Sequence, residues 1–161
     1  MRAQVPALLL LLCALPACQP SEDAIRKAVA EELQRHTGSA WVSPTPVIGP
    51  YTPAVRAGRF LFVSGQIALD PETGTLRNDD IETETRQVLD NIGRILRASG
   101  YDSSEVVSAV VYLTDMGSYA KMNLVYGGYF LEGKYPARTA VQVAALPKGA
   151  NVEIAVVAYK Q

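Results

Sequence analysis

Residues 135–159 read YPARTAVQVAALPKGANVEIAVVAY, and this segment is the most informative about the fold. It holds two runs rich in β-branched residues, 138–145 and 151–159, separated by LPKGAN, whose Pro and Gly are typical of a turn. The pattern predicts two strands. Because apolar residues stand on both sides of the pleat, both faces of the sheet should be covered, and another subunit is the simplest cover for the second face.

The segments before this stretch predict the remaining elements. Residues 59–67, RFLFVSGQI, predict a strand, and the following D-P-E-T-G-T predicts a turn that closes a hairpin. Apolar residues recur at helical spacing from Ile81 to Ile95, after a capping-box-like pair, Asp79 and Glu82, and predict a helix that ends at Gly100. A strand over 105–113 and a helix over 118–130 complete an α+β fold, with two helices on one face of a mixed sheet.

Length and charge restrict the class of protein. The chain has 161 residues, of which 48% are hydrophobic, and this suffices for one domain with a buried core. A formal net charge of -1 and a pI near 5.8 leave no basic surface to neutralise phosphates. We therefore expect a small-molecule partner and no nucleic acid.

The N-terminal segment predicts export. Residues 1–17 resemble a secretory signal peptide, because a basic start precedes an apolar stretch too short to remain as a membrane span. Residues 15–18, L-P-A-C, resemble a bacterial lipobox, which would place a lipid on Cys18 and anchor the protein to a membrane; ordinary signal cleavage nearby is the alternative. Gln19 after that cysteine favours a periplasmic protein attached to the outer membrane.

The domain is predicted to begin near residue 48. Residues 18–47 predict a tether, with a short amphipathic helix over 21–36 followed by a Pro-rich linker. Residues 48–161 then form the globular domain.

Several kinds of site are excluded by composition. Both cysteines, Cys13 and Cys18, lie in the first eighteen residues, so the domain has no thiol for a disulfide, a metal or nucleophilic catalysis. The only histidine, His36, lies outside the domain, and a Ser-His-Asp triad is not expected. Neither metal-ligand spacing nor a glycine-rich phosphate loop occurs, so we predict no metal and no cofactor.

Two charged residues interrupt the apolar strands of the opening stretch. Arg138 begins one strand and Glu153 lies within the other, and antiparallel pairing across LPKGAN would bring both side chains to one pocket. A structural ion pair, or two charges at a rim, is the alternative that the residues leave open. Tyr51 and Gly65 are weaker signals, since a buried tyrosine usually belongs to the core and a glycine in a strand usually marks a bulge.

Longer motifs resemble one known family. They are IGPY (48–51), FVSGQI (62–67), the D-N-I of the first domain helix, VVYLTDM (110–116), MNLVYGGYF (122–130) and the opening stretch. Together they resemble the Rid family of reactive-intermediate imine deaminases, also called YjgF/YER057c/UK114, from about Ile48 to Tyr159. The resemblance implies a chorismate-mutase-like, YjgF-type fold and a homotrimer whose sheets form an inner barrel, with pockets between subunits.

The resemblance also implies an activity. Family members hydrolyse enamine and imine intermediates such as 2-aminoacrylate to 2-oxo acids and ammonia. By position, Arg138 would bind the substrate carboxylate and Glu153 would hold the attacking water. The other pocket positions of the family match Tyr51, Gly65, Asn123 and Ala140, the last of which stands where many members have cysteine.

Two alternatives to this enzyme remain. A pocket that binds a stable carboxylate metabolite without turning it over would keep the same residues. This matters because an exported protein is separated from cytoplasmic sources of imines and would depend on periplasmic amine or amino-acid oxidases. The endoribonuclease activity sometimes attributed to the family fits poorly with the charge of the chain.

Overall fold

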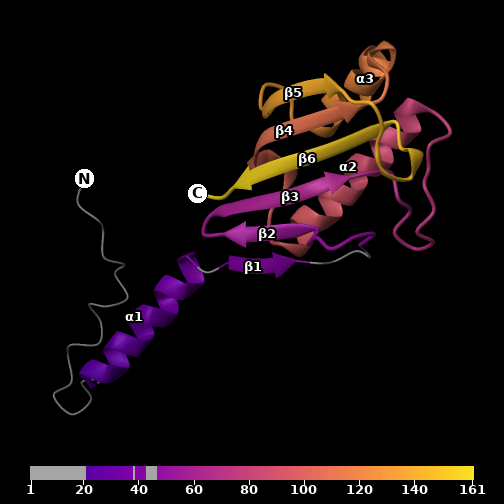
Figure 1. The fold of residues 1–161 in the computed structure, drawn as a ribbon. Coiled ribbons are helices and arrows are strands. Elements are labelled where there is room, and N and C mark those ends of the chain that lie inside the picture. Colours follow the sequence, from indigo (N-terminus) through magenta and orange to yellow (C-terminus); the bar gives the residue numbers. More distant parts are fainter. Residues whose placement is uncertain (1–20, 38, 43–46) are drawn as a thin grey trace. The chain divides into compact units, whose positions relative to one another are not determined.

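The computed structural model describes residues 21–37, 39–42 and 47–161 (Figure 1). The chain divides into two units, residues 1–36 and 37–161, and the helix predicted over 21–36 is present as α1 (Glu22–Thr37). The predicted signal peptide, the lipobox-like residues 15–18 and residues 43–46 of the Pro-rich linker lie outside the described residues. Within the described residues, no helix has the length and hydropathy needed to cross a bilayer.

The second unit is built on one six-stranded mixed sheet with the strand order β1-β2-β3-β6-β4-β5 (Figure 1). Only β4 and β5 are parallel, and all other neighbours are antiparallel. β1 lies within the predicted tether, so the sheet begins before residue 48. The strands are β1 (Ser39–Val42), β2 (Ala54–Ala57), β3 (Phe60–Gln66), β4 (Val106–Leu113), β5 (Ala137–Gln142) and β6 (Val152–Tyr159).

The predicted pairing of the last two strands is wrong, because β4 lies between β5 and β6. The connection over residues 143–151 is longer than a tight hairpin loop and passes around the end of β4. Val143 N–H donates to the Leu113 carbonyl, and Thr114 N–H donates to the Asn151 carbonyl. The LPKGAN segment contains a short 3₁₀ helix, η5 (Pro147–Gly149), in place of a hairpin turn.

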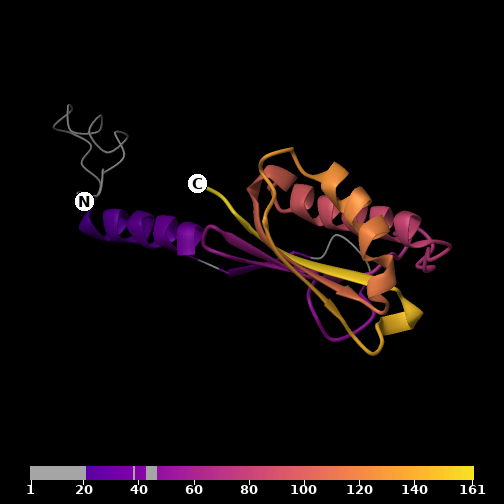
Figure 2. The ribbon, with the colours of Figure 1, turned by 90° about the horizontal axis from the view of Figure 1, so that it is seen from above.

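Both predicted domain helices are present, and they cover one face of the sheet (Figure 2). α2 (Ile81–Ala98) begins after Asp80, whose carboxylate accepts from Thr83 N–H at 2.7 Å, so the cap lies one residue beyond the predicted Asp79. α3 (Tyr119–Tyr129) follows the 3₁₀ helix η4 (Met116–Ser118), and η3 (Ser103–Glu105) precedes β4. The predicted turn after β3 is present, with Gly74 at a φ of 69°.

The sheet has one face packed on the helices and one open face. Side chains alternate along a strand, and those of β4 and β6 on the helix face, such as Val111 and Ile154, are fully buried. The open face is also apolar, as the sequence predicts, and Phe60 and Phe62 remain 43% and 49% exposed there. Its apolar members are Phe60, Phe62, Val110, Tyr112, Val141, Ala155, Val157 and Tyr159.

Candidate functional site

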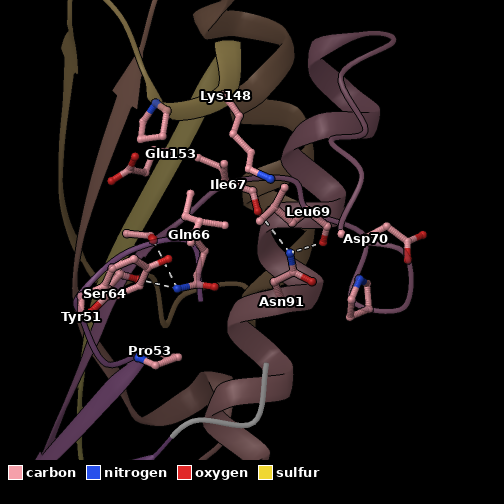
Figure 3. A pocket seen from close by; sticks show the side chains of 15 residues that line it. Tyr51, Pro53, Ser64, Gln66, Ile67, Leu69, Asp70, Asn91, Lys148 and Glu153 are labelled. Carbon is pink, nitrogen blue, oxygen red and sulfur yellow. Dashed lines mark hydrogen bonds between the residues drawn. The ribbon is translucent and has the colours of Figure 1, made fainter. Parts of the chain in front are cut away.

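A cavity of about 460 Å³ lies where the pairing of β3 and β6 becomes irregular (Figure 3). Val63 pairs with Val156 and Gln66 with Ile154, so β3 contains one extra residue and forms a β-bulge. Such bulges redirect side chains and occur often beside functional sites. The lining residues that carry the argument below are Tyr51, Gly65, Asn91, Lys148 and Glu153.

Gly65 and Glu153 meet in this cavity. A Cβ placed on Gly65 would lie 1.9 Å from Glu153 Oε1, so only glycine leaves room for the carboxylate in this position. Burial raises the pKa of Glu153 above its ordinary value, because the charged form loses hydration. Within the described part of the chain, no donor forms a hydrogen bond with this carboxylate, which leaves it able to accept a bond from water or substrate.

Tyr51 and Lys148 also line the cavity (Figure 3). The Tyr51 side chain is 41% exposed, so the tyrosine belongs to the cavity wall and not to the core. Lys148 adopts a φ of 56°, a left-handed conformation that is uncommon for residues other than glycine. Lys148 was not predicted as a site residue, because no sequence pattern predicts a left-handed backbone conformation at a lysine.

Arg138 lies in a second cluster, against α3. Its Nη2 donates to Tyr119 Oη at 2.9 Å and to Asn123 Oδ1 at 2.7 Å. The guanidinium carbon lies 4.4 Å from the centroid of the Tyr126 ring, within the range of a cation–π interaction. α3 therefore holds one nitrogen of the guanidinium, and in the described residues the Nε and Nη1 donors have no acceptor. Ala140 lies on the same strand, partly buried against the core.

Tyr126 forms the floor of this second cluster. Burial raises the pKa of its phenol to about 12, and its Oη has no hydrogen-bond partner in the part of the chain that the structure describes. The ring, and not the hydroxyl, is therefore what contacts Arg138. Tyr119 and Tyr126 were not identified from the sequence as site residues, because no local pattern shows that they contact Arg138.

The two clusters lie on opposite faces of the sheet within one chain. Arg138 pairs with Ala109 and Glu153 pairs with Tyr112, and both of these partners are on β4. Ala109 and Tyr112 are an odd number of residues apart, so their side chains, and those of their partners, point in opposite directions. Arg138 and Glu153 therefore share no pocket in one chain and form no ion pair there.

Gly65, Tyr51 and Glu153 are thus brought together by the structure, and Asn123 and Ala140 accompany Arg138 instead. Among the described residues, no group of three or more His, Cys, Asp or Glu side chains is arranged to hold a metal ion. The groups at hand are a carboxylate of raised basicity, a phenol and an oriented guanidinium, which can bind a carboxylate and assist the addition of water.

Comparison with known proteins gives consistent matches. Residues 42–160 match the family model described as endoribonuclease L-PSP. A RutC family protein of Pyrococcus horikoshii is 53% identical over 119 residues, which cover 74% of this chain and 93% of that protein. The 2-iminobutanoate/2-iminopropanoate deaminase of Mus musculus is 46% identical over 111 residues, covering 69% and 82%. The crystal structure of E. coli TdcF with bound serine superposes with a TM-score of 0.71 at 33% identity, covering 76% of this chain and 99% of that one.

Proposed function

The chain belongs to the endoribonuclease L-PSP family, which includes the YjgF, RutC and Rid proteins, and from this we propose that it hydrolyses reactive 2-imino acids to 2-oxo acids and ammonia. Relatives named as imine deaminases support this activity at the level of the family. The observation that carries the proposal for this chain is the environment of the Glu153 carboxylate. The carboxylate is half-buried in a cavity, accepts no hydrogen bond from the described residues, and occupies the space that a side chain at position 65 would fill.

Each step of the reaction has a residue suited to it. Arg138 binds the carboxylate of the imino acid through its free donors, and the planar guanidinium orients the C=N bond. Glu153 removes a proton from water while the water oxygen bonds to the imine carbon, and the π electrons move to nitrogen, which takes a proton from solvent. Protonated Glu153 then gives its proton to the amino nitrogen of the carbinolamine, the hydroxyl proton passes to solvent as the C=O bond forms, the C–N bond breaks, and ammonia leaves. Tyr51 closes the cavity wall.

The site is complete only where two chains meet. Since Arg138 and Glu153 face opposite sides of one sheet, a substrate that touches both must lie between Arg138 of one copy and Glu153 of another. The apolar open face supports association, because Phe60 and Phe62 are about half exposed in a single chain. A homotrimer with one such pocket at each interface is the arrangement proposed, and size-exclusion chromatography with light scattering tests it.

The proposed location is the periplasm, with a lipid on Cys18. The support is the lipobox-like sequence at residues 15–18. Expression of the full-length chain, followed by separation of membranes from soluble protein, tests this. Wild type should be found in the membrane fraction, and Cys18→Ala should not. A wild-type protein found only in the cytoplasm would contradict the proposal.

The activity is tested with protein lacking residues 1–18. An amino-acid oxidase generates the imino acid, and semicarbazide traps the imine that remains. Wild type should accelerate imine loss, and Glu153→Gln should lower kcat by about 100-fold if the carboxylate is a general base. No acceleration over several imino acids, with binding of a 2-oxo acid retained, would favour the alternative of a non-catalytic carboxylate-binding protein.

A further inference from the structure

Two polar residues on the buried side of α2 bind chain segments that lead to residues lining the cavity. Glu84 is 0% exposed and Asn91 is 4% exposed, among side chains that are otherwise mostly apolar. Burying a carboxylate or an amide costs free energy unless hydrogen bonds replace those made with water. An apolar residue would fill either position at a lower desolvation cost, so the polar groups need an explanation beyond packing.

Glu84 holds the start of β6. Its Oε1 accepts the backbone N–H of Asn151 at 2.6 Å and that of Val152 at 3.3 Å. Its Oε2 accepts Nδ2–H of the Asn151 side chain at 2.9 Å. The next residue along the chain is Glu153. These bonds, which we call the Glu84–Asn151 clamp, therefore attach the backbone immediately before Glu153 to α2.

Asn91 holds the opposite wall. Its Nδ2 donates to the carbonyl of Ile67 at 3.2 Å and to that of Leu69 at 2.8 Å (Figure 3). Gln87 Nε2 donates to its Oδ1 at 3.1 Å. These carbonyls follow Gly65 along the chain. Helix α2 thus binds both the segment that follows Gly65 and the segment that precedes Glu153.

The ladder between β3 and β6 cannot set this spacing alone. Regular pairing is interrupted between Val63 and Gln66, which is where Gly65 faces Glu153. At a bulge the strands lose part of their mutual hydrogen bonding, and local geometry depends on other contacts. The buried polar side chains of α2 supply such contacts on both sides of the interruption.

We propose that Glu84 is a positioning residue for Glu153, acting through the Glu84–Asn151 clamp. The effect on turnover rests on the proposed deaminase function, whereas the effect on the position of Glu153 does not. Glu84 touches no substrate. It orients the strand that presents the catalytic carboxylate, and its loss should lower kcat and leave KM nearly unchanged, because Arg138 binds the substrate carboxylate elsewhere.

The clamp is tested in the full-length protein by exchanging its carboxylate and its amide, with Glu84→Gln and Asn151→Asp made singly and together. Asn151→Asp alone places two carboxylates against each other and should lower kcat by about 10-fold or more, since the buried charge loses its donor. Glu84→Gln alone sets one amide against another and should lower kcat less, because an amide can rotate. In the double variant, the amide at position 84 can donate to the carboxylate at position 151, and the total charge is that of wild type. The kcat should therefore return to within about 3-fold of wild type.

A matched control is Glu82→Gln, on the same helix turn. Glu82 is partly exposed, and its Oε1 lies 3.8 Å from Lys121 Nζ. Glu82 takes no part in the Glu84–Asn151 clamp, so its substitution should change neither kcat nor KM. The proposal is overturned if the double variant is folded, with the thermal unfolding of wild type, yet is no more active than Asn151→Asp. A change in KM in place of kcat would also overturn it.

A crystal structure of each variant gives a readout that needs no activity. The contact of the Glu153 carboxylate with Gly65 should be lost in Asn151→Asp and restored in the double variant. If wild type has no deaminase activity, the proposed function fails while this structural test still stands. If wild type is active and Glu153 stays in place in every variant, the clamp proposal alone fails.

Discussion

Arg138 and Glu153 lie on opposite faces of a single sheet, on strands that flank β4 from either side. A substrate bound by both must therefore contact two chains. Arg138→Ala and Glu153→Ala should each be inactive alone. When the two are unfolded together and refolded as mixed copies of the proposed trimer, about a quarter of the interfaces should combine an intact arginine with an intact glutamate.

The measurement is imine deaminase activity of the mixture against each variant refolded alone. Refolded wild type is the control for recovery. Recovery of about a quarter of the wild-type activity is expected from random mixing. A mixture that forms oligomers and yet remains as inactive as its components would show that the two residues do not act together across an interface.

Gly65→Ala should remove activity without unfolding the domain. The new Cβ would displace the Glu153 carboxylate, which is the end of a flexible side chain and can rotate away. We expect kcat to fall by about 100-fold, as for loss of the general base itself. Because both changes remove one function, Gly65→Ala combined with Glu153→Ala should be no worse than Glu153→Ala.

A matched control for that substitution is Gly128→Ala. Gly128 lies in α3 with no atom within 4 Å of the added Cβ. Activity should stay near wild type, and the free energy of unfolding should rise by up to about 1 kcal/mol, because alanine has a higher helix propensity than glycine. Equal losses of kcat in both alanine variants would contradict the steric explanation.

Tyr126→Phe should be tolerated. The buried Oη has no partner among the described residues, so its removal relieves a polar group and preserves the ring beneath Arg138. We expect the free energy of unfolding to stay equal or rise by up to about 1 kcal/mol, and substrate KM to remain unchanged. Tyr126→Leu, which lacks the ring, should raise KM. Chemical denaturation and steady-state kinetics measure the two effects, and a strongly destabilised phenylalanine variant would indicate a partner for the hydroxyl.

The pH profile should report Glu153. A general base acts when deprotonated, so activity is lost as pH falls through its pKa. Burial raises that pKa above the ordinary 4.5, and the acid limb of log kcat/KM should therefore lie above pH 4.5. Glu153→Gln should abolish the limb. A limb below pH 4.5, or one that persists in the glutamine variant, would assign the titration to another group.

Asp70 should stabilise the turn after β3 in a pH-dependent way. Backbone N–H groups of Glu72 and Thr73, with Arg77, lower its pKa to about 2 from 3.8. The stabilisation is present above pH 3.8 and is lost as pH falls through about 2. Asp70→Asn should thus unfold at a lower temperature than wild type at pH 7, with the difference shrinking towards pH 2. A constant difference at both pH values would contradict this assignment.

Local patterns in the sequence determined much of the fold. The helical spacing from Ile81 to Ile95 is present as α2, and the apolar alternation around Phe62 and Ile154 is present as paired strands with two apolar faces. These features could be predicted because the periods of helices and strands depend on neighbouring residues only. Arg138 and Glu153 could be proposed as site residues because charges in apolar strands need a reason to be there.

How these parts combine depends on contacts between segments that are distant in sequence. A sequence period does not state which strands are neighbours, so β4 between β5 and β6, and with it the separation of Arg138 from Glu153, could not be derived from either strand. Glu84 and Asn91 gave no local sign of the backbone groups that they bind, since those groups lie more than 20 residues away along the chain. Strand order and buried hydrogen bonds depend on residues distant in sequence, and folding brings those residues together.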